Sequence, residues 1–303
     1  MKNNTHITNP KHSYLYKVDN PTAPKLNSLI KLHKPNQPIR PLINSKTAPN
    51  YKIAKHIAKL LKNKIKLNNN YTIKNSYHLT EHLKNIKVNE NTKLYSFDVK
   101  NMYTNIPITE TINIITQKLI KNKEDDILIK QITSTLKTIL NQNYFQHNQI
   151  IYQQTDGLAM GAPTSAIISE IFLQELDEQI INTIKTNDTN GKYYRYVDDT
   201  IYISQNNGKN IEKIKNTINK IHNNIKFTIE EETNNKLNFL DLTIINKIPK
   251  LEFKIYRKET QTDQIIPNNT NHPYQHKMAT FHSLIHRMLR LPSVTQKRIK
   301  KGT

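Results

Sequence analysis

Two adjacent aspartates, Asp198 and Asp199, lie in the middle of YYRYVDDTIYI, a run of aromatic and β-branched residues at 193–203 that otherwise reads as β-strand. Burying a carboxylate is unfavourable unless a cation or hydrogen bonds compensate it. Neighbouring residues of a strand point to opposite faces, whereas a tight turn can present both acids at its tip. The two flanking runs therefore predict a hairpin with the aspartates at its tip. For the dipeptide alone, an ordinary exposed aspartate-rich turn is the competing explanation.

A third aspartate, Asp98, comes near the end of another apolar segment, KLYSFDV at residues 93–99, which we expect to be a buried strand. If this strand neighbours the hairpin in one sheet, Asp98 and the aspartate pair meet at the same edge. Three carboxylates there offer hard oxygen ligands for two divalent cations such as Mg²⁺. Two such ions align an attacking hydroxyl, a phosphorus and a leaving oxygen, so the acids predict a two-metal site for phosphoryl transfer.

The chain is strongly basic, with 45 Lys and Arg against 24 Asp and Glu and a formal net charge of +21 over 303 residues. The positive charge is spread along the chain and favours a polyanionic partner; a general compositional bias toward Lys, Asn and Ile is the alternative. The sequence has no cysteine, which excludes disulfides and cysteine-ligated zinc. No apolar run approaches the roughly 20 residues that cross a bilayer, and the N-terminus lacks a cleavage signature. We expect a soluble intracellular protein.

The remaining periodicities mix strands with helices and predict an α+β sheet covered on one side by helices. Helices are predicted at 50–65, at 108–120 with Thr109 as N-cap, at 125–140, and after the glycine-bearing turn that begins at residue 157. The proline-rich segment 29–44 is expected to be extended. The other expected elements are a hairpin at 144–154 with residues 147–149 in its turn, strands at 225–232, 235–245 and 250–258, and a basic helical tail.

Taken in order, the motifs resemble those of reverse transcriptases, most closely those of Penelope-like retroelements. They are RPLI (40–43), SFDVKNMYTNIP (96–107), GLAMGAPTSAIISEIF (157–172), YRYVDDTIYI (194–203), NKLNFLDLTI (235–244) and IYRKETQT (255–262). With their flanks they span residues 25–290. The chain departs from the family pattern at APTSA and RKET, and no GIY-YIG nuclease segment is recognisable.

The resemblance implies a right-hand polymerase with fingers, palm and thumb, in which an antiparallel palm sheet is backed by helices. It implies an irregular leader at 1–25, the first part of the fingers at 26–92, and the first part of the palm at 93–108. A connection between fingers and palm then occupies 109–154, the main palm 155–250, and the primer grip and thumb 251–303.

The resemblance also assigns roles to the acids. Asp98 and Asp198 match the family's metal ligands, Asp199 matches the second acid of its motif, and the carbonyl of Val99 completes the metal site on the nucleotide side. The implied cofactors are two Mg²⁺ ions, with Mn²⁺ as the alternative ion. Lys236 matches a proton donor to the leaving pyrophosphate, although a solvated loop lysine has the same appearance. Asp241 is expected to be structural.

The implied nucleotide site contains Tyr103, which matches an aromatic gate against the ribose 2′-hydroxyl; a plain core aromatic is the alternative. Arg40, with Lys34 or Lys31, is the expected triphosphate clamp. Gly157 and Gly161 are expected to let the backbone approach the nascent base pair. The full set of nucleotide-binding candidates is Lys34, Arg40, Val99, Asn101, Met102, Tyr103, Met160 and Gly161.

The function implied is that of an RNA-directed DNA polymerase. Its partners would be an RNA template, a DNA primer or RNA–DNA hybrid, and deoxynucleoside triphosphates, with no membrane. One alternative is an inactive nucleic-acid-binding remnant of a retroelement, which would gain stability by losing its mutually repelling acids. An RNA-templated RNA polymerase is the other alternative, and Tyr103 disfavours it.

Overall fold

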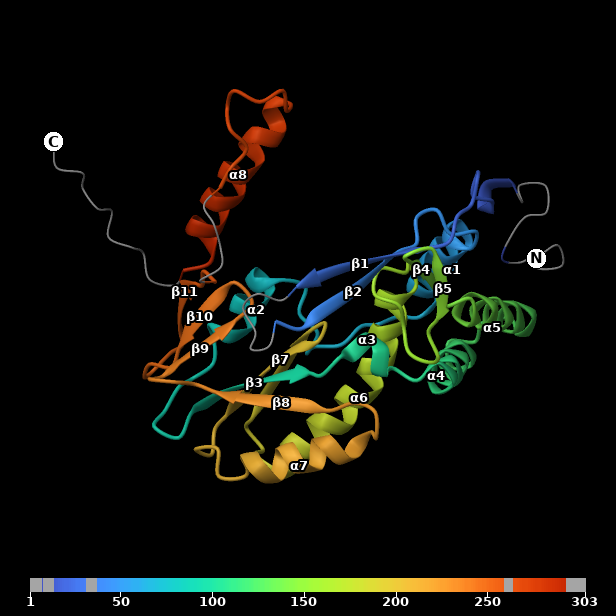
Figure 1. The fold of residues 1–303 in the computed structure, drawn as a ribbon. Coiled ribbons are helices and arrows are strands. Elements are labelled where there is room, and N and C mark those ends of the chain that lie inside the picture. Colours follow the sequence, from blue (N-terminus) through green and yellow to red (C-terminus); the bar gives the residue numbers. More distant parts are fainter. Residues whose placement is uncertain (1–6, 8–13, 31–36, 259–263, 293–303) are drawn as a thin grey trace. The chain divides into compact units, whose positions relative to one another are not determined.

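The computed structural model describes residues 7, 14–30, 37–258 and 264–292 (Figure 1). Contacts between residues divide the chain into two units. Unit 1 comprises Met1–Asn68, Lys100–Ile180 and Asn219–Lys226, and unit 2 comprises Asn69–Val99, Ile181–Ile218 and Phe227–Thr303. No helix in the described part of the chain is long and apolar enough to cross a membrane.

The helices of unit 1 follow the apolar periodicity of the sequence. They are α1 (Tyr51–Lys64), α3 (Met102–Asn105), α4 (Ile108–Lys121), α5 (Asp126–Asn141) and most of α6 (Ser165–Asn187). In α1 the buried residues are Ile53, Ala54, Ile57 and Leu61, which lie on one face, as expected for an amphipathic helix. The predicted helices at 50–65, 108–120 and 125–140 are therefore confirmed, as is the long helix after residue 157.

The predicted N-cap of α4 is wrong. The N-cap residue is Pro107, and Thr109 lies inside the first turn. Three contacts explain this start without a threonine cap. The Thr111 hydroxyl donates to the Pro107 carbonyl at 2.6 Å, the Thr111 amide donates to the same carbonyl at 3.1 Å, and the Ile108 amide donates to Oδ1 of Asp156 at 3.4 Å. A carboxylate from another segment thus accepts from a free amide of the first turn.

The sheet of unit 1 has the order β2-β1-β4-β5. Its strands are β1 (Lys25–Ile30), β2 (Ile39–Asn44), β4 (Tyr144–His147) and β5 (Ile150–Gln153). The extended segment and the hairpin expected from the sequence both lie in this sheet. Asn148 and Gln149 form the hairpin's turn with φ of 47° and 64°, the left-handed conformation at both central positions that suits a two-residue hairpin. His147, which was expected in the turn, instead ends β4 and pairs with Ile150.

The main sheet of unit 2 is entirely antiparallel and has the order β6-β7-β3-β8. Figure 1 labels β7, β3 and β8 of this sheet. Its strands are β6 (Lys192–Tyr196), β7 (Asp199–Ser204), β3 (Lys93–Val99) and β8 (Phe227–Glu231). The predicted strand at 93–99 and the predicted hairpin at 193–203 are confirmed, and they are neighbours. The placement of both aspartates at the tip is wrong, because the turn is formed by Val197 and Asp198 and Asp199 begins β7. Residues 201–204 of β7 are all buried, which accounts for the unbroken apolar reading of that strand.

A second sheet of unit 2, in the order β11-β10-β9, corrects one prediction. The segment expected as a single strand at 235–245 is a hairpin of β9 (Lys236–Phe239) and β10 (Leu242–Ile245), followed by β11 (Glu252–Ile255). The chain reverses at Leu240, whose φ is 53°. This sheet packs against the main sheet and α2 (Ser76–Leu83), and their shared core includes Leu79, Leu83, Leu94, Ile201, Ile203, Leu237, Phe239 and Leu242.

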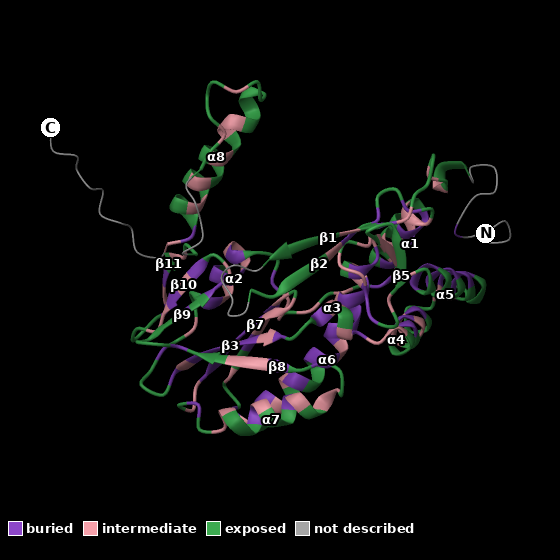
Figure 2. Ribbon diagram, in the orientation of Figure 1, coloured by how far each residue is buried: buried purple, intermediate pink, exposed green. Residues whose placement is uncertain are grey.

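Two more helices follow late in the chain. In α7 (Ile211–Ile221), Ile214 and Ile218 are buried one turn apart. The predicted C-terminal helix is α8 (Tyr274–Arg290), which has no buried residue and is coloured as exposed or intermediate throughout in Figure 2. It joins the rest of unit 2 through a hydrogen bond between Tyr77 and His286 at 2.7 Å and an ion pair between Arg287 and Asp241 at 3.1 Å.

Many turns of the chain place asparagine, and not glycine, at positions with positive φ, and the whole chain has only 5 glycines. Asparagine adopts the left-handed conformation more readily than other side-chain-bearing residues do. Among the described residues, the asparagines with positive φ are Asn20, Asn101, Asn148, Asn207, Asn234 and Asn235.

Candidate active site

Strand register in unit 2 brings the aspartates together. Asp98 on β3 is the direct partner of Asp199 on β7, and Asp199 is in turn the partner of Tyr196 on β6. Residues directly opposite each other on antiparallel strands share one face of the sheet. Asp98 and Asp199 therefore lie side by side on one face, and Asp198 adjoins them in the two-residue turn between β6 and β7.

The turn that carries Asp198 is conformationally unusual. Val197, its first residue, has a φ of 55°, a left-handed value that a β-branched residue rarely adopts. Its carbonyl accepts a hydrogen bond of 2.9 Å from Nη1 of Arg195, whose side chain is buried. Strained backbone of this kind persists only when surrounding contacts fix it, and it is found at functional sites. The residue before the acid pair is thus held by a buried cation.

The three acids suit a metal that shares its ligands with a substrate. Asp98, Asp198 and Asp199 are each half-buried. In the described part of the chain, no group of three or more His, Asp or Glu side chains is arranged so that it could hold a metal ion by itself. Mg²⁺ in nucleotide-handling sites binds one or two carboxylates, together with water and substrate phosphates. Two carboxylates on adjacent strands with a third in the adjoining turn fit that incomplete donor set, and Val99 ends β3 next to Asp98.

Two tyrosines pack on the opposite face of the same sheet. Tyr95 and Tyr202 stack with their ring centroids 5.9 Å apart. Tyr95 lies three residues before Asp98, so strand alternation puts it on the other face. Burial raises the pKa of Tyr95 to about 12, helped by the charges of Glu231 and Glu232. Burial also raises the pKa of Tyr202, whose hydroxyl donates to Asp188 at 2.7 Å. This face is a buried support for the acid-bearing strands.

Unit 1 gathers the candidates for nucleotide binding around the loop at 157–161. The half-buried Tyr103 lies in α3, and its carbonyl accepts a hydrogen bond of 2.7 Å from the Leu158 amide. Gly157 has a φ of 82°, and a β-carbon there would collide with the backbone of Thr104. Only glycine lets the loop approach α3 so closely.

The same loop is bound to β2. The Ile43 amide donates to the Met160 carbonyl at 2.7 Å, and the Ser45 hydroxyl donates to the Gly161 carbonyl at 3.1 Å. A β-carbon on Gly161 would lie 2.5 Å from the Ile43 carbonyl oxygen, and its φ is 102°. The close approach that requires both glycines is therefore made to the protein's own backbone. Arg40 lies exposed on β2, the strand whose Ile43 amide donates to Met160.

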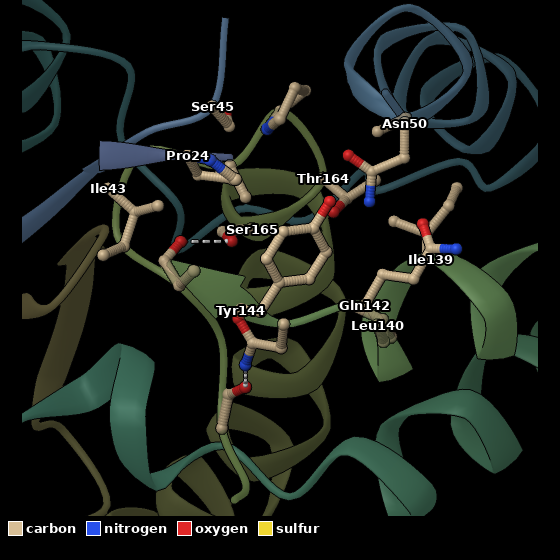
Figure 3. Close-up of a pocket in the computed structure, with 16 residues that line it drawn as sticks. Pro24, Ile43, Ser45, Asn50, Ile139, Leu140, Gln142, Tyr144, Thr164 and Ser165 are labelled. Atoms are coloured by element: carbon tan, nitrogen blue, oxygen red, sulfur yellow. Dashed lines mark hydrogen bonds between the residues drawn. The ribbon is translucent and has the colours of Figure 1, made fainter. Parts of the chain in front are cut away.

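A small cavity of about 40 Å³ lies behind this loop (Figure 3). At its margins the Asn143 amide donates to the Gly157 carbonyl at 3.1 Å, and the Ser165 hydroxyl donates to the Ala159 carbonyl at 2.7 Å. The buried Thr164 hydroxyl, also in its lining, has no hydrogen-bond partner among the described residues. A cavity of this size has room for about three water molecules. The hydrogen bonds from Asn143 and Ser165 thus hold the loop that carries Met160 and Gly161 at the edge of this cavity.

The remaining candidates are placed as follows. Asn101 precedes α3 with a φ of 48° and is exposed, whereas Met102 is only 3% exposed and so contributes packing rather than a free side chain. Lys236 is exposed at the start of β9. Asp241 lies in the β9–β10 turn, where it binds Arg287 and accepts from Ser76 at 3.3 Å, a structural role as expected. Lys31 and Lys34 lie outside the described residues.

Sequence reasoning missed Arg195. The available signal was an arginine inside an apolar strand, two residues before the turn that carries the acids. Its importance depends on its burial and on the bond to Val197, which only the fold reveals.

Comparison with known families gives one match to most of the chain. A model described as reverse transcriptase (RNA-dependent DNA polymerase) matches residues 32–263. None of the curated proteins compared with the chain matches it.

Several solved structures resemble the fold. Telomerase from Candida tropicalis, truncated of its C-terminal domain, aligns with a TM-score of 0.54 and 14% identity over 78% of this chain and 56% of that chain. Candida albicans telomerase, in complex with a fragment of telomeric RNA, aligns with a TM-score of 0.58 and 10% identity over 77% of this chain and 47% of that chain. An RNA-dependent RNA polymerase aligns with a TM-score of 0.51 and 11% identity over 78% of this chain and 23% of that chain. These likenesses show the right-hand polymerase fold, and this chain spans about half the length of the telomerases.

Proposed function

Because this chain belongs to the reverse transcriptase family, we propose that it extends a primer 3′-hydroxyl with deoxynucleoside triphosphates on an RNA template. The observation that carries the proposal is the register that sets Asp98 opposite Asp199, with Asp198 in the adjoining turn. A cluster of mutually repelling carboxylates is costly in a protein without a cation to bind. The RNA held by the similar Candida albicans telomerase structure supports an RNA partner.

In this proposal the acids hold the metal and the rest of the chain positions the substrates. Asp98 and Asp198 are the ligands, Asp199 assists them, and the Val99 carbonyl completes the nucleotide side. Two bound Mg²⁺ ions, or Mn²⁺ in their place, would favour the ionised primer hydroxyl and neutralise charge on the phosphates. Lys236 would give a proton to the leaving pyrophosphate.

The nucleotide would bind at the loop of unit 1. Arg40 offers a planar guanidinium with several donors that match phosphate oxygens, with Lys34 as its partner in the clamp. Tyr103 would exclude a ribose 2′-hydroxyl by its bulk, while Asn101, Met160 and Gly161 shape the surrounding surface and Met102 packs beneath it. The backbone bonds from the 157–161 loop to α3 and β2 support this placement, because they tie Tyr103, Met160 and the strand of Arg40 to one another.

The order of motifs further supports a Penelope-like, retroelement-derived enzyme. We assign the fingers to 26–92, the palm to 93–108 and 155–250, the connection to 109–154, and the primer grip and thumb to 251–303. Both runs that carry the acids then belong to the palm.

Primer extension tests the proposal directly. RNA and DNA templates are each offered with deoxynucleotides and with ribonucleotides, and incorporation is measured for the wild-type chain and for Asp198→Asn. We expect deoxynucleotide incorporation on RNA, and its loss by a factor of about 100 or more in the variant, as when a group that stabilises transition-state charge is removed.

Asp126→Asn is the matched control, since Asp126 is an exposed aspartate on α5, outside the candidate site. It should incorporate nucleotides like the wild type. Full activity of Asp198→Asn would refute the metal assignment. Salt-sensitive binding to RNA without any incorporation by the wild type would instead support the inactive remnant.

A further inference from the structure

Arg195 is a fully buried cation next to the acid-bearing turn. Its side chain is 1% exposed, and its strand partner on β7 is Thr200, which is itself 0% exposed. A guanidinium stays charged in a protein, and burying it is unfavourable unless its donors are satisfied. Replacing a buried charged group and its partner by apolar side chains of similar volume is often neutral or stabilising. The charge therefore calls for an explanation beyond core packing.

One hydrogen bond of this guanidinium is made to the turn. Nη1 of Arg195 donates to the Val197 carbonyl at 2.9 Å. That carbonyl belongs to the peptide unit that joins Val197 to Asp198, so the bond fixes the peptide plane from which Asp198 starts. Because Val197 holds a left-handed φ of 55°, the turn needs such a restraint to persist.

The backbone of Arg195 is itself fixed on both sides. Its amide donates to the Tyr71 carbonyl at 2.9 Å, and its carbonyl accepts from the Ile73 amide at 2.9 Å. On its other edge, β6 is paired with β7 along the whole strand. The guanidinium thus extends from a rigid base within unit 2 and can hold the turn in one geometry.

We propose that Arg195 is a positioning residue, which through the Val197 carbonyl holds Asp198 and Asp199 in the arrangement with Asp98 that binds divalent metal. The inference rests on the proposed polymerase function for its catalytic consequence. Its structural core, that Arg195 restrains the turn, is independent of activity. An arginine that only filled the core would affect overall stability and leave the turn and its metal dependence unchanged.

The test compares Arg195→Lys, Arg195→Met and the control Thr200→Val in the full chain. Thr200 occupies the paired position on the same face, and its hydroxyl has no hydrogen-bond partner among the described residues. Hydrogen–deuterium exchange of peptides covering residues 193–203 measures how strongly the amides of the turn are protected, and it does not require an active enzyme. Primer extension across a Mg²⁺ titration reads the half-saturating Mg²⁺ concentration separately from the rate at saturation.

We expect exchange at the turn amides to accelerate by about tenfold in Arg195→Met, the factor expected for loss of one charge-assisted hydrogen bond. The half-saturating Mg²⁺ concentration should rise by a similar factor. Arg195→Lys keeps a cationic donor, so its exchange rate and its half-saturating Mg²⁺ concentration should lie between those of Arg195→Met and the wild type. Thr200→Val should match the wild type in both measurements.

Wild-type exchange and Mg²⁺ dependence in a folded Arg195→Met chain would overturn the inference. If Arg195→Met fails to fold, Arg195→Lys decides by the same two measurements. An inactive wild type with the expected exchange pattern would refute the polymerase function and leave the restraint of the turn standing.

Discussion

At the scale of single residues, the three aspartates differ in how the backbone holds them. Asp98 and Asp199 are fixed by ladder hydrogen bonds on adjacent strands, whereas Asp198 depends on the turn and on Arg195. Sequence analysis predicted that the three acids would meet, because two strand-like runs each bore an acid near one end. It could not find Arg195, since the burial of that arginine is set by strand pairing and packing, which spacing along the chain does not reveal.

Tyr103 gives a prediction about sugar selection. Tyr103→Ala should raise the use of ribonucleotides relative to deoxynucleotides, because removing the ring opens space at the 2′ position. The measurement is the ratio of kcat/KM for the two substrates, with the wild-type chain in parallel. Unchanged discrimination would assign Tyr103 to plain packing against the loop at Leu158.

Gly161 gives a prediction about stability. Gly161→Ala places a β-carbon 2.5 Å from the Ile43 carbonyl oxygen at a φ of 102°. We expect a loss of about 1–3 kcal/mol in the free energy of unfolding, the usual range for strained backbone. Urea unfolding measures it. An unchanged free energy of unfolding in Gly161→Ala would contradict this account of the glycine.

At the scale of helices and strands, segments with sustained apolar periodicity were predicted correctly, whereas a turn without glycine or proline was missed. The predicted helices at 50–65 and 125–140 show sustained apolar spacing, and the structure confirms them. The β9–β10 hairpin was missed because its turn, Leu240–Asp241, contains neither glycine nor proline. Helix α7 was not predicted, since its short apolar stripe lies among lysines and asparagines.

Helix α1 gives a prediction about nucleic-acid binding. It has no acidic residue, and its exposed lysines Lys52, Lys55, Lys59 and Lys62 recur at helical spacing. They span about 15 Å along the helix, a length that can follow several phosphates. Reversing Lys55 and Lys59 to Glu should reduce the slope of log affinity against log salt by about 1.5, because two phosphate contacts are lost.

The matched control reverses Lys213 and Lys220, exposed lysines on α7, with the same change in net charge. Binding to single-stranded RNA is measured for both double variants over a range of salt concentrations. An equal reduction in both would show that general charge, and not the α1 stripe, sets the affinity.

At the scale of the whole molecule, the chain folds as two units, and the candidates for metal binding and for nucleotide binding belong to different units. The acids lie in unit 2 and the nucleotide-loop residues in unit 1. The sequence indicated the α+β class and the motif order. The division into units could not be predicted, because each unit is assembled from three separate segments of the chain.

Global stability should depend on alkaline pH through Tyr95. Its folded pKa of about 12 exceeds the ordinary value of 10, because burial disfavours the charged form. The folded state therefore keeps a proton that the unfolded state loses, so this contribution to stability is full below pH 10 and is lost as pH rises toward 12. Tyr95→Phe should flatten the fall in stability across that window. Urea unfolding at several pH values measures it, and an unchanged pH dependence would contradict the burial argument.

The asparagine turns have a consequence for the denatured ensemble. A chain with only 5 glycines in 303 residues samples fewer backbone conformations when denatured, so it loses less entropy on folding. Left-handed asparagines such as Asn148 and Asn207 carry a steric cost in the native state that glycine would not. The lower conformational entropy of the denatured chain offsets this steric cost, and the offset cannot be seen in any contact of the native structure.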